Sequence, residues 1–130
     1  MQIPHIYPVT IYYEDTDITG YVYHPNYLKY FERARSDFFD GEKLRRMQFE
    51  DKISVVVYKV EAIFKKGAVL GDKIEIHSTA KVEGNYKVVV NQQAVRVKDS
   101  TLLVDGTVEL VCISDARLIS LPGWIGQKIQ

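Results

Sequence analysis

The sequence predicts an α+β protein in which one long helix packs on one face of a curved antiparallel sheet of five strands. Three observations predict this arrangement. One segment, beginning at Pro25, has apolar residues at helical spacing, a β-rich segment precedes it, and four runs with strand character follow it. The length of 130 residues suits one hydrophobic core, so we expect a single domain spanning residues 1–130.

The first strand is expected at residues 9–13 and is predicted to end near Glu14. This stretch is β-branched and aromatic, and it follows Pro4 and Pro8, which disfavour a helix. The next residues, 15–20, are polar and end in a glycine, a composition typical of a turn. We therefore expect a loop between the first strand and the helix, and this loop is unusually rich in carboxylates.

The helix is the clearest element in the pattern. Apolar side chains recur every three or four positions, at Tyr27, Phe31, Ala34 and Phe38. Charged side chains occupy positions between them, at Lys29, Glu32, Arg33 and Arg35. Pro25 suits the first turn, and Asp40 with Gly41 supplies a stop, which predicts about fifteen residues and a length of about 22 Å. A second, short helix is expected at residues 42–48.

After the helical region the pattern is β to the end. Strands are expected at residues 53–65, 74–82, 86–97 and 102–113. Segments 83–85 and 98–100 have the composition of hairpin turns. The pair Asp105–Gly106 inside the last run predicts a bulge. Residues 122–130 have the character of a loosely attached terminus, although Trp124 and Ile125 favour burial.

Charge and composition exclude several classes of function. Lysine plus arginine number 17 and aspartate plus glutamate number 17, so no overall field would gather nucleic acid or an anionic membrane surface. Cys112 is the only cysteine, which excludes an internal disulfide and a cysteine-based zinc site. No segment has the pattern of a signal peptide or the length of a transmembrane span. We expect a cytoplasmic protein with no transmembrane segment and no nucleic-acid partner.

Residues 13–27 carry most of the groups that could do chemistry. Carboxylates and a histidine gather there: Glu14, Asp15, Asp17 and His24. A helix N-terminus presents unpaired N–H groups and the positive end of the helix dipole, which stabilise an oxyanion. A carboxylate opposite it could activate water or attack an acyl carbon. Asp15 and Asp17 equally suit Asx turns, and His24 a local hydrogen bond, so spacing alone leaves the function open.

The same segment resembles a family signature. From Tyr13 to Arg35 it reads Tyr-x-Asp-Thr-Asp-x-x-Gly-x-Val-Tyr-His-x-x-Tyr-Leu-x-x-x-Glu-x-Ala-Arg. This run is similar to the signature of the hot-dog-fold acyl-CoA thioesterases of the 4-hydroxybenzoyl-CoA thioesterase class, and in detail to the bacterial branch associated with the Tol–Pal system. The resemblance implies a hot-dog fold and hydrolysis of acyl-CoA to free acid and CoA, without a metal or cofactor. The acyl carrier could equally be acyl carrier protein.

The resemblance also implies roles for individual residues. Asp17 occupies the position of the catalytic carboxylate, which is either the nucleophile or the general base. His24 occupies the position whose backbone N–H binds the carbonyl oxygen, and its side chain also belongs to the site. Tyr13 would lie near the acyl group. Gly20 would let the loop approach the substrate without an intervening side chain.

Two further features concern substrate binding and the choice of base. Lys65 and Lys66 follow the long second strand and could meet CoA phosphates, with a solvated strand end as the alternative. Gly67 stands where the family commonly has proline, which predicts a more mobile loop. Glu32 on the helix is a second candidate for the base, with pairing to a helix arginine as the alternative.

Other functions and the assembly follow from the same reasoning. A non-catalytic module that binds acyl-CoA or acyl carrier protein is the main alternative, since one fold hosts many functions. A dehydratase or hydratase would need a different Asp/His constellation from the one on this loop. The resemblance, together with an exposed sheet edge, implies a homo-oligomer with the site between subunits, either a dimer or a dimer of dimers, that is, a homotetramer.

Overall fold

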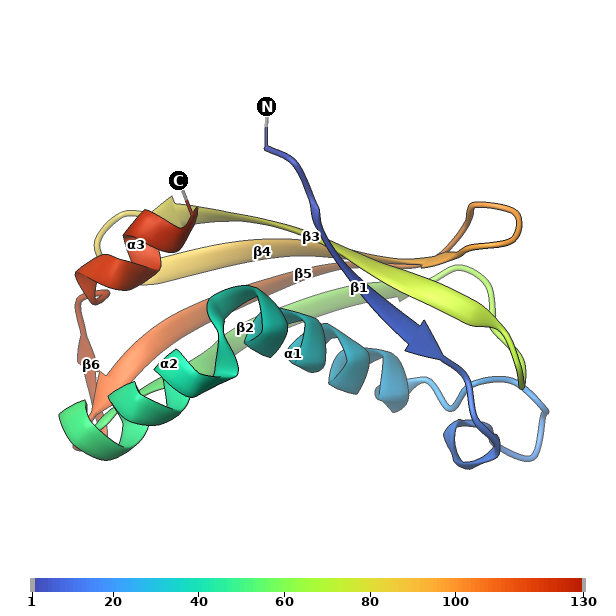
Figure 1. Cartoon of the computed structure of the whole chain (residues 1–130), viewed down its shortest axis with the longest axis horizontal. Coiled ribbons are helices and arrows are strands. Elements are labelled where there is room, and N and C mark those ends of the chain that lie inside the picture. The colour runs from blue at the N-terminus through green and yellow to red at the C-terminus, as the bar shows by residue number, and fades with distance from the viewer. Residues whose placement is uncertain (1, 130) are drawn as a thin grey trace.

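The computed structural model describes residues 2–129 and shows a six-stranded antiparallel sheet crossed by one long helix (Figure 1). The order in the sheet is β1-β3-β4-β5-β2, and β6 pairs with β5 off this path. The strands are β1 (His5–Thr10), β2 (Ile53–Phe64), β3 (Lys73–Glu83), β4 (Lys87–Arg96), β5 (Thr101–Ser114) and β6 (Arg117–Ile119). The helices are α1 (Pro25–Phe39), α2 (Gly41–Arg46) and α3 (Gly123–Ile129). The predicted α+β class is confirmed, with one strand more than the five expected.

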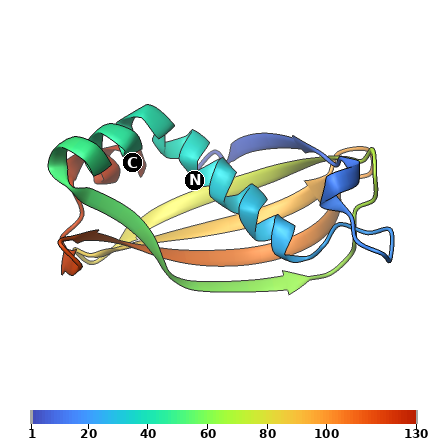
Figure 2. The same ribbon diagram turned by 90° about the horizontal axis from the view of Figure 1, so that it is seen from below.

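The long helix and the four strands after it form where the periodicity predicts them. Helix α1 has 15 residues and begins with Pro25 in its first turn. Strands β2 to β5 each begin and end within one residue of the predicted boundaries. The buried side chains of α1 are Tyr27, Tyr30, Phe31, Ala34, Arg35 and Phe39. They pack against one face of the sheet, which α1 crosses obliquely (Figure 2).

Close packing of α1 on the sheet depends on Gly106 in β5. A Cβ atom at this position would lie 2.8 Å from Cε2 of Phe31 and 3.3 Å from the carbonyl oxygen of Glu61. Pairing with β4 is continuous through Asp105 and Gly106, so the predicted bulge at this pair is wrong. The register shift lies earlier in β5, next to the partner of Ala94. The glycine therefore gives the helix room instead of bending the strand.

We expect Gly106→Ala to lower the free energy of unfolding by about 1–3 kcal/mol, because the added methyl group overpacks the helix against the sheet. Urea unfolding followed by circular dichroism measures this change. Gly126→Ala in α3 is a matched control, because nothing lies within 4 Å of a Cβ added there. The control should be neutral or slightly stabilising. Equal unfolding midpoints for Gly106→Ala and the wild type would contradict the packing argument.

The first strand lies earlier in the chain than predicted. Strand β1 ends at Thr10, whereas the sequence predicts a strand at residues 9–13. Pro8 is accommodated because β1 is an edge strand of the sheet. Beyond β1 the Asp15 carboxylate accepts the N–H of Tyr12 at 2.8 Å, and Tyr13–Asp15 form a 3-10 turn. This local side-chain bond competes with strand pairing and ends the β segment early.

The C-terminal residues pack on the core, so the prediction of a loosely attached end is wrong. Ile125 in α3 is 1% exposed, and the Trp124 ring packs edge-on against Phe39 with centroids 6.4 Å apart. Burial of Ile125 and partial burial of Trp124 fix the segment, as the apolar character of these two residues predicts. The second helix, predicted at residues 42–48, is present as α2, and a π-helical turn at Met47–Asp51 continues it.

Candidate active site

Residues 15–23, before α1, fold back on themselves as a small two-stranded ribbon. Its first arm is residues 15–17 and its second arm is residues 21–23. Thr16 and Val22 form an isolated antiparallel bridge. Nearer the tip, the N–H of Asp17 donates to the Tyr21 carbonyl at 2.9 Å, and the N–H of Gly20 donates to the Asp17 carbonyl at 3.0 Å. Gly20 has a φ of +88°, a left-handed conformation that glycine adopts without strain. The ribbon therefore has a defined shape, and it lies at the N-terminal end of α1 (Figure 1).

The Asp17 carboxylate is exposed and bonded on one oxygen. Oδ1 accepts the backbone N–H of Thr19 at 2.8 Å and also the Thr19 hydroxyl. These bonds form an Asx turn, so Asp17 does adopt the turn geometry that its sequence context allows. The Thr19 hydroxyl, followed by the Thr19 N–H, holds the pKa of Asp17 below its usual value, with a smaller contribution from His24. Within residues 2–129, Oδ2 accepts no hydrogen bond, which leaves one oxygen of an ionised carboxylate free.

His24 stands directly before the first turn of α1, as its N-cap residue. Its backbone N–H donates to no acceptor in the described part of the chain, as is usual for a donor at a helix start. Its exposed ring packs edge-on against Tyr23 and Phe64, with centroids 5.3 and 5.6 Å away. Phe64 is the last residue of β2, so the structure brings the loop, the start of α1 and the end of the long strand together.

The predicted substrate-binding residues Tyr13, Lys65 and Lys66 lie in different surroundings. Tyr13 lies in the 3-10 turn with 80% of its surface exposed, and its carbonyl accepts the Thr16 hydroxyl at 2.8 Å. The backbone of Tyr13, more than its ring, thus supports the loop. Lys65 and Lys66 are both exposed beyond the end of β2, with their N–H groups donating to the Leu103 carbonyl at 2.8 and 3.1 Å. Of the two lysines, Lys66 lines a pocket next to the loop.

This pocket has a volume of about 430 Å³ and lies against the arm of the ribbon that contains Tyr21. Its lining residues are Tyr21, Lys66, Gly67, Val69 and Arg96. A Cβ atom at Gly67 would lie 2.6 Å from Cδ1 of Tyr21, so the tyrosine ring occupies the space that a larger residue would need. The glycine at position 67 therefore has a packing reason. The greater mobility predicted for this segment stays a prediction.

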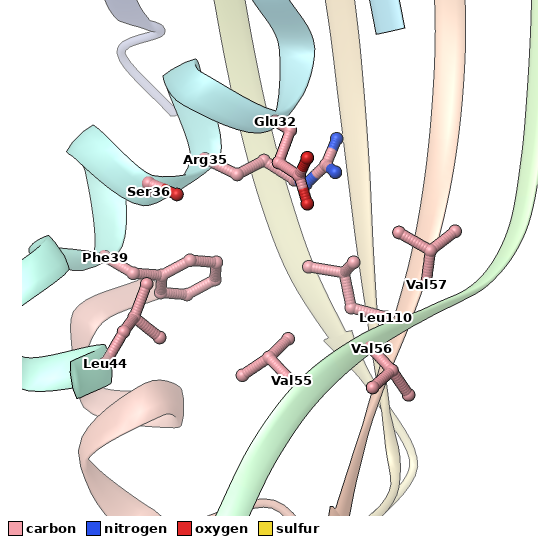
Figure 3. A pocket seen from close by; sticks show the side chains of 9 residues that line it. All are labelled: Glu32, Arg35, Ser36, Phe39, Leu44, Val55, Val56, Val57 and Leu110. Carbon is pink, nitrogen blue, oxygen red and sulfur yellow. The ribbon is translucent and has the colours of Figure 1, made fainter. Parts of the chain in front are cut away.

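A groove runs along α1 beside β2 (Figure 3). It consists of two hollows of about 230 and 330 Å³ that share Glu32, Arg35 and Val57. The first hollow reaches Leu28, one helical turn beyond His24, and the second reaches Leu44. The remaining lining residues are the polar Lys29 and Ser36 and the apolar Val55, Val56, Val60, Val108, Leu110 and Phe39. The periodicity predicts the buried face of α1 but not this groove, which depends on the gap between a helix and an edge strand.

Glu32 lies in this groove and not at the loop. It is eight residues beyond His24, which places it about 12 Å further along the helix axis. Burial lowers the pKa of Arg35, and the charge of Glu32 opposes that shift. Within residues 2–129 no ion pair of Glu32 lies within 4 Å, since the Arg35 guanidinium donates to Gln92 instead, so both the pairing alternative and the role of Glu32 as a base stay predictions.

Sequence reasoning missed Asn26, which joins the loop to the helix. Its side-chain Nδ2 donates to the Asp15 carbonyl at 2.9 Å. Its backbone N–H donates to the Tyr23 carbonyl, also at 2.9 Å. An amide side chain in the first turn, directly after a carboxylate-rich loop, is the signal that could have indicated this contact.

Comparison with known proteins decides the family. A family model described as the thioesterase-like superfamily matches residues 12–129. The chain belongs to this superfamily. It is 32% identical over 118 residues to the acyl-CoA thioester hydrolase YbgC of Escherichia coli O6:H1, covering 86% of this chain and 84% of that protein. It is 38% identical over 92 residues to the acyl-CoA thioesterase YbgC of Helicobacter pylori 26695, covering 71% and 68%.

Solved structures agree with this membership. The 1,4-dihydroxy-2-naphthoyl-CoA thioesterase Slr0204 from Synechocystis matches with a TM-score of 0.90 at 19% identity, over 97% of this chain and 95% of that chain. A probable thioesterase from Bartonella henselae matches with a TM-score of 0.78 at 27% identity, over 93% and 100%. The predictions of a hot-dog fold and of a thioester hydrolase are confirmed for this member of the thioesterase-like superfamily. The association with the Tol–Pal system stays a prediction.

Proposed function

We propose that the protein hydrolyses acyl-CoA to free acid and CoA, with Asp17 as nucleophile or general base and His24 at the thioester carbonyl. One observation carries the assignment of residues. A carboxylate with a free oxygen and an N–H without a partner lie at the two sides of one short loop before the long helix, and the charge of His24 contributes to the lowered pKa of Asp17. The acyl-CoA thioesterases named among the relatives support acyl-CoA as the substrate class.

The chemistry follows from these groups. The His24 N–H and the positive end of α1 stabilise the negative charge that develops on the carbonyl oxygen. As a base, Asp17 takes a proton from water while the water oxygen bonds to the acyl carbon, the C–S bond breaks and the proton passes to the leaving sulfur. As a nucleophile, Asp17 bonds to the acyl carbon, the C–S bond breaks and water then cleaves the anhydride. Both routes need the ionised carboxylate, which the lowered pKa supplies at neutral pH.

The surroundings suggest where the substrate lies. The groove along α1 would hold the acyl group, because its hollow at Leu28 begins one turn from His24 and has mostly apolar walls. Lys66, and Lys65 beside it, would contact the CoA phosphates, since the pocket at Lys66 borders the ribbon that carries Asp17. The exposed ring of Tyr13 would contact the substrate near the acyl group, as the family resemblance implies.

We further propose a homo-oligomer, either a dimer or a dimer of dimers. Strand β2 is an edge of the sheet, 12 residues long, and pairs on one side with β5. It exposes large apolar side chains at Val57, Tyr58, Val60, Ile63 and Phe64. Such an edge favours pairing with a second copy, which would place the groove near the interface. Sedimentation velocity tests this proposal, and a monomer with full activity would contradict it.

We propose that the protein is cytoplasmic, on the grounds of its cysteine chemistry. No helix within residues 2–129 is long and apolar enough to cross a membrane. Cys112 is buried and unpaired, which suits a reducing compartment such as the cytoplasm. Both acyl-CoA and acyl carrier protein would be available as acyl donors there.

Thiol release from short, long and aromatic acyl-CoAs tests the proposed function directly. We expect the wild-type protein to release CoA from at least one of these classes. Binding of acyl-CoA without any thiol release would favour the non-catalytic module instead. Addition of water to an enoyl-CoA, detected by product analysis, would favour a hydratase.

A further inference from the structure

We propose that Asp15 and Asn26 are positioning residues that hold Asp17 opposite the His24 N–H, an inference that rests on the proposed function. The Asp15 carbonyl is the centre of the contact. It accepts the N–H of Tyr23 at 2.9 Å and the Nδ2 of Asn26 at 2.9 Å. These bonds close the base of the ribbon. We call Asp15, Tyr23 and Asn26 together the clamp.

The clamp sets the spacing between the two groups of the site. Asp17 lies two residues beyond Asp15 on one arm of the ribbon, and His24 follows Tyr23 directly on the other arm. The backbone N–H of Asn26 also donates to the Tyr23 carbonyl, so the first turn of α1 holds the second arm as well. Any shift of the Asp15 carbonyl relative to α1 therefore changes the distance from the Asp17 carboxylate to the His24 N–H.

The turn before the clamp supports it, and a buried residue of α1 lies close to it. On the strand side, the Asp15 carboxylate accepts the Tyr12 N–H at 2.8 Å, which orients the residue through its side chain. On the helix side lies Tyr30, which is 1% exposed and whose hydroxyl has no hydrogen-bond partner in the described residues. Burial raises the pKa of Tyr30 far above its usual value, and the nearby Asp15 carboxylate raises it further. The Asp15 side chain is thus held by the turn before it and lies near a buried residue of α1.

The bonds of the clamp differ from those of an ordinary helix cap. An N-cap residue satisfies N–H groups within its own helix, whereas the Asn26 side chain donates outward to a residue eleven positions earlier. Removing it leaves the backbone bonds of α1 in place. The expected consequence is a looser ribbon on an intact helix. A displacement of about 1 Å at a reacting group can cost on the order of a hundredfold in rate.

The first test is Asn26→Ala, measured with the wild-type acyl-CoA substrate. We expect kcat to fall about tenfold to a hundredfold with KM changed less than about twofold, because groups move relative to each other while the binding surfaces stay. In Asn26→Asp, kcat should fall at least as far, because aspartate has the same size as asparagine but no side-chain N–H to donate. Asn91→Ala is the matched control, because this exposed β4 residue accepts only the Thr107 hydroxyl. Wild-type kcat in Asn26→Ala would overturn the proposal.

A double variant separates positioning from general damage. If Asn26 acts through Asp17, then Asn26→Ala should lower the residual activity of Asp17→Asn no further. An equal additional loss in that background would show that Asn26 acts elsewhere and would overturn the proposal.

Amide hydrogen exchange gives a readout that needs no activity. In Asn26→Ala the amides of Asp17 and Tyr23 should exchange at least tenfold faster, while amides in β4 stay protected. Unchanged exchange at these two amides would overturn the clamp even if the wild-type protein released no thiol. Absence of thiol release from the wild type would instead refute the proposed function.

Discussion

Asp17→Asn is expected to lower kcat for acyl-CoA hydrolysis at least about a hundredfold without altering the fold. Asparagine has the same shape, and its amide oxygen can still accept the Thr19 N–H and hydroxyl that Oδ1 accepts in the wild type. The ribbon should therefore keep its geometry. What disappears is the negative charge, and with it the ability to take a proton from water or to attack the acyl carbon.

The measurement is steady-state thiol release at saturating acyl-CoA, with circular dichroism and thermal unfolding to confirm the fold. Asp115→Asn is the matched control, because it removes the same charge from an exposed turn between β5 and β6. The kcat of His24→Ala should lie between those of Asp17→Asn and Asp115→Asn, at about a tenfold loss, because the backbone N–H of residue 24 remains. Turnover of Asp17→Asn within a few-fold of the wild type would rule out both proposed roles of Asp17.

The fold was largely predictable because its elements differ in side-chain period. Helix α1 and strands β2 to β5 are each long enough for helical spacing or alternation to be recognised. The first strand was misplaced because residues 9–13 have strand composition, yet the bond between Asp15 and the Tyr12 N–H ends pairing. Gly106 was misread for a similar reason. Its role depends on Phe31, a residue 75 positions away in the chain that no local pattern connects to it.

The candidate site residues could be named from the sequence, whereas their contacts could not. The motif located Asp17, His24 and Gly20 because all three lie within one short segment. The groove, the packing of Phe64 on His24 and the Tyr21 ring over Gly67 join segments that are distant in the sequence. Their arrangement depends on how α1 lies on the sheet.

The position of α1 on the sheet depends in turn on a buried polar network. Gln92 in β4 is fully buried, and its Oε1 accepts Nη1 of Arg35 at 2.9 Å. Its Nε2 donates to the Phe31 carbonyl and to the Ser78 hydroxyl, both at 3.0 Å. One side chain of the sheet thereby satisfies two groups of the helix and one of β3. Arg35 also lines the groove, so the same network shapes the proposed acyl site.

We expect Gln92→Leu to lower the free energy of unfolding by about 2–4 kcal/mol, because the buried guanidinium of Arg35 loses a charge-assisted hydrogen bond. The Phe31 carbonyl and the Ser78 hydroxyl lose theirs as well, and each unsatisfied buried group adds to the cost. Urea unfolding measures the change. Gln93→Leu is the matched control, since this partly exposed neighbour bonds only the Asp105 carboxylate, and it should cost less than about 1 kcal/mol.

The double variant Arg35→Met with Gln92→Leu distinguishes a charge effect from a packing effect. If the loss in Gln92→Leu comes from an uncompensated buried charge, then replacing Arg35 with an apolar side chain of similar length should recover part of the stability. If the loss comes from poor packing of leucine, the two substitutions should add. Additive losses would therefore contradict the role of the network. Recovery of stability would show that the loss comes from the unsatisfied Arg35 guanidinium, and hence that its bond to Gln92 helps to hold α1, the helix at whose start the proposed site lies.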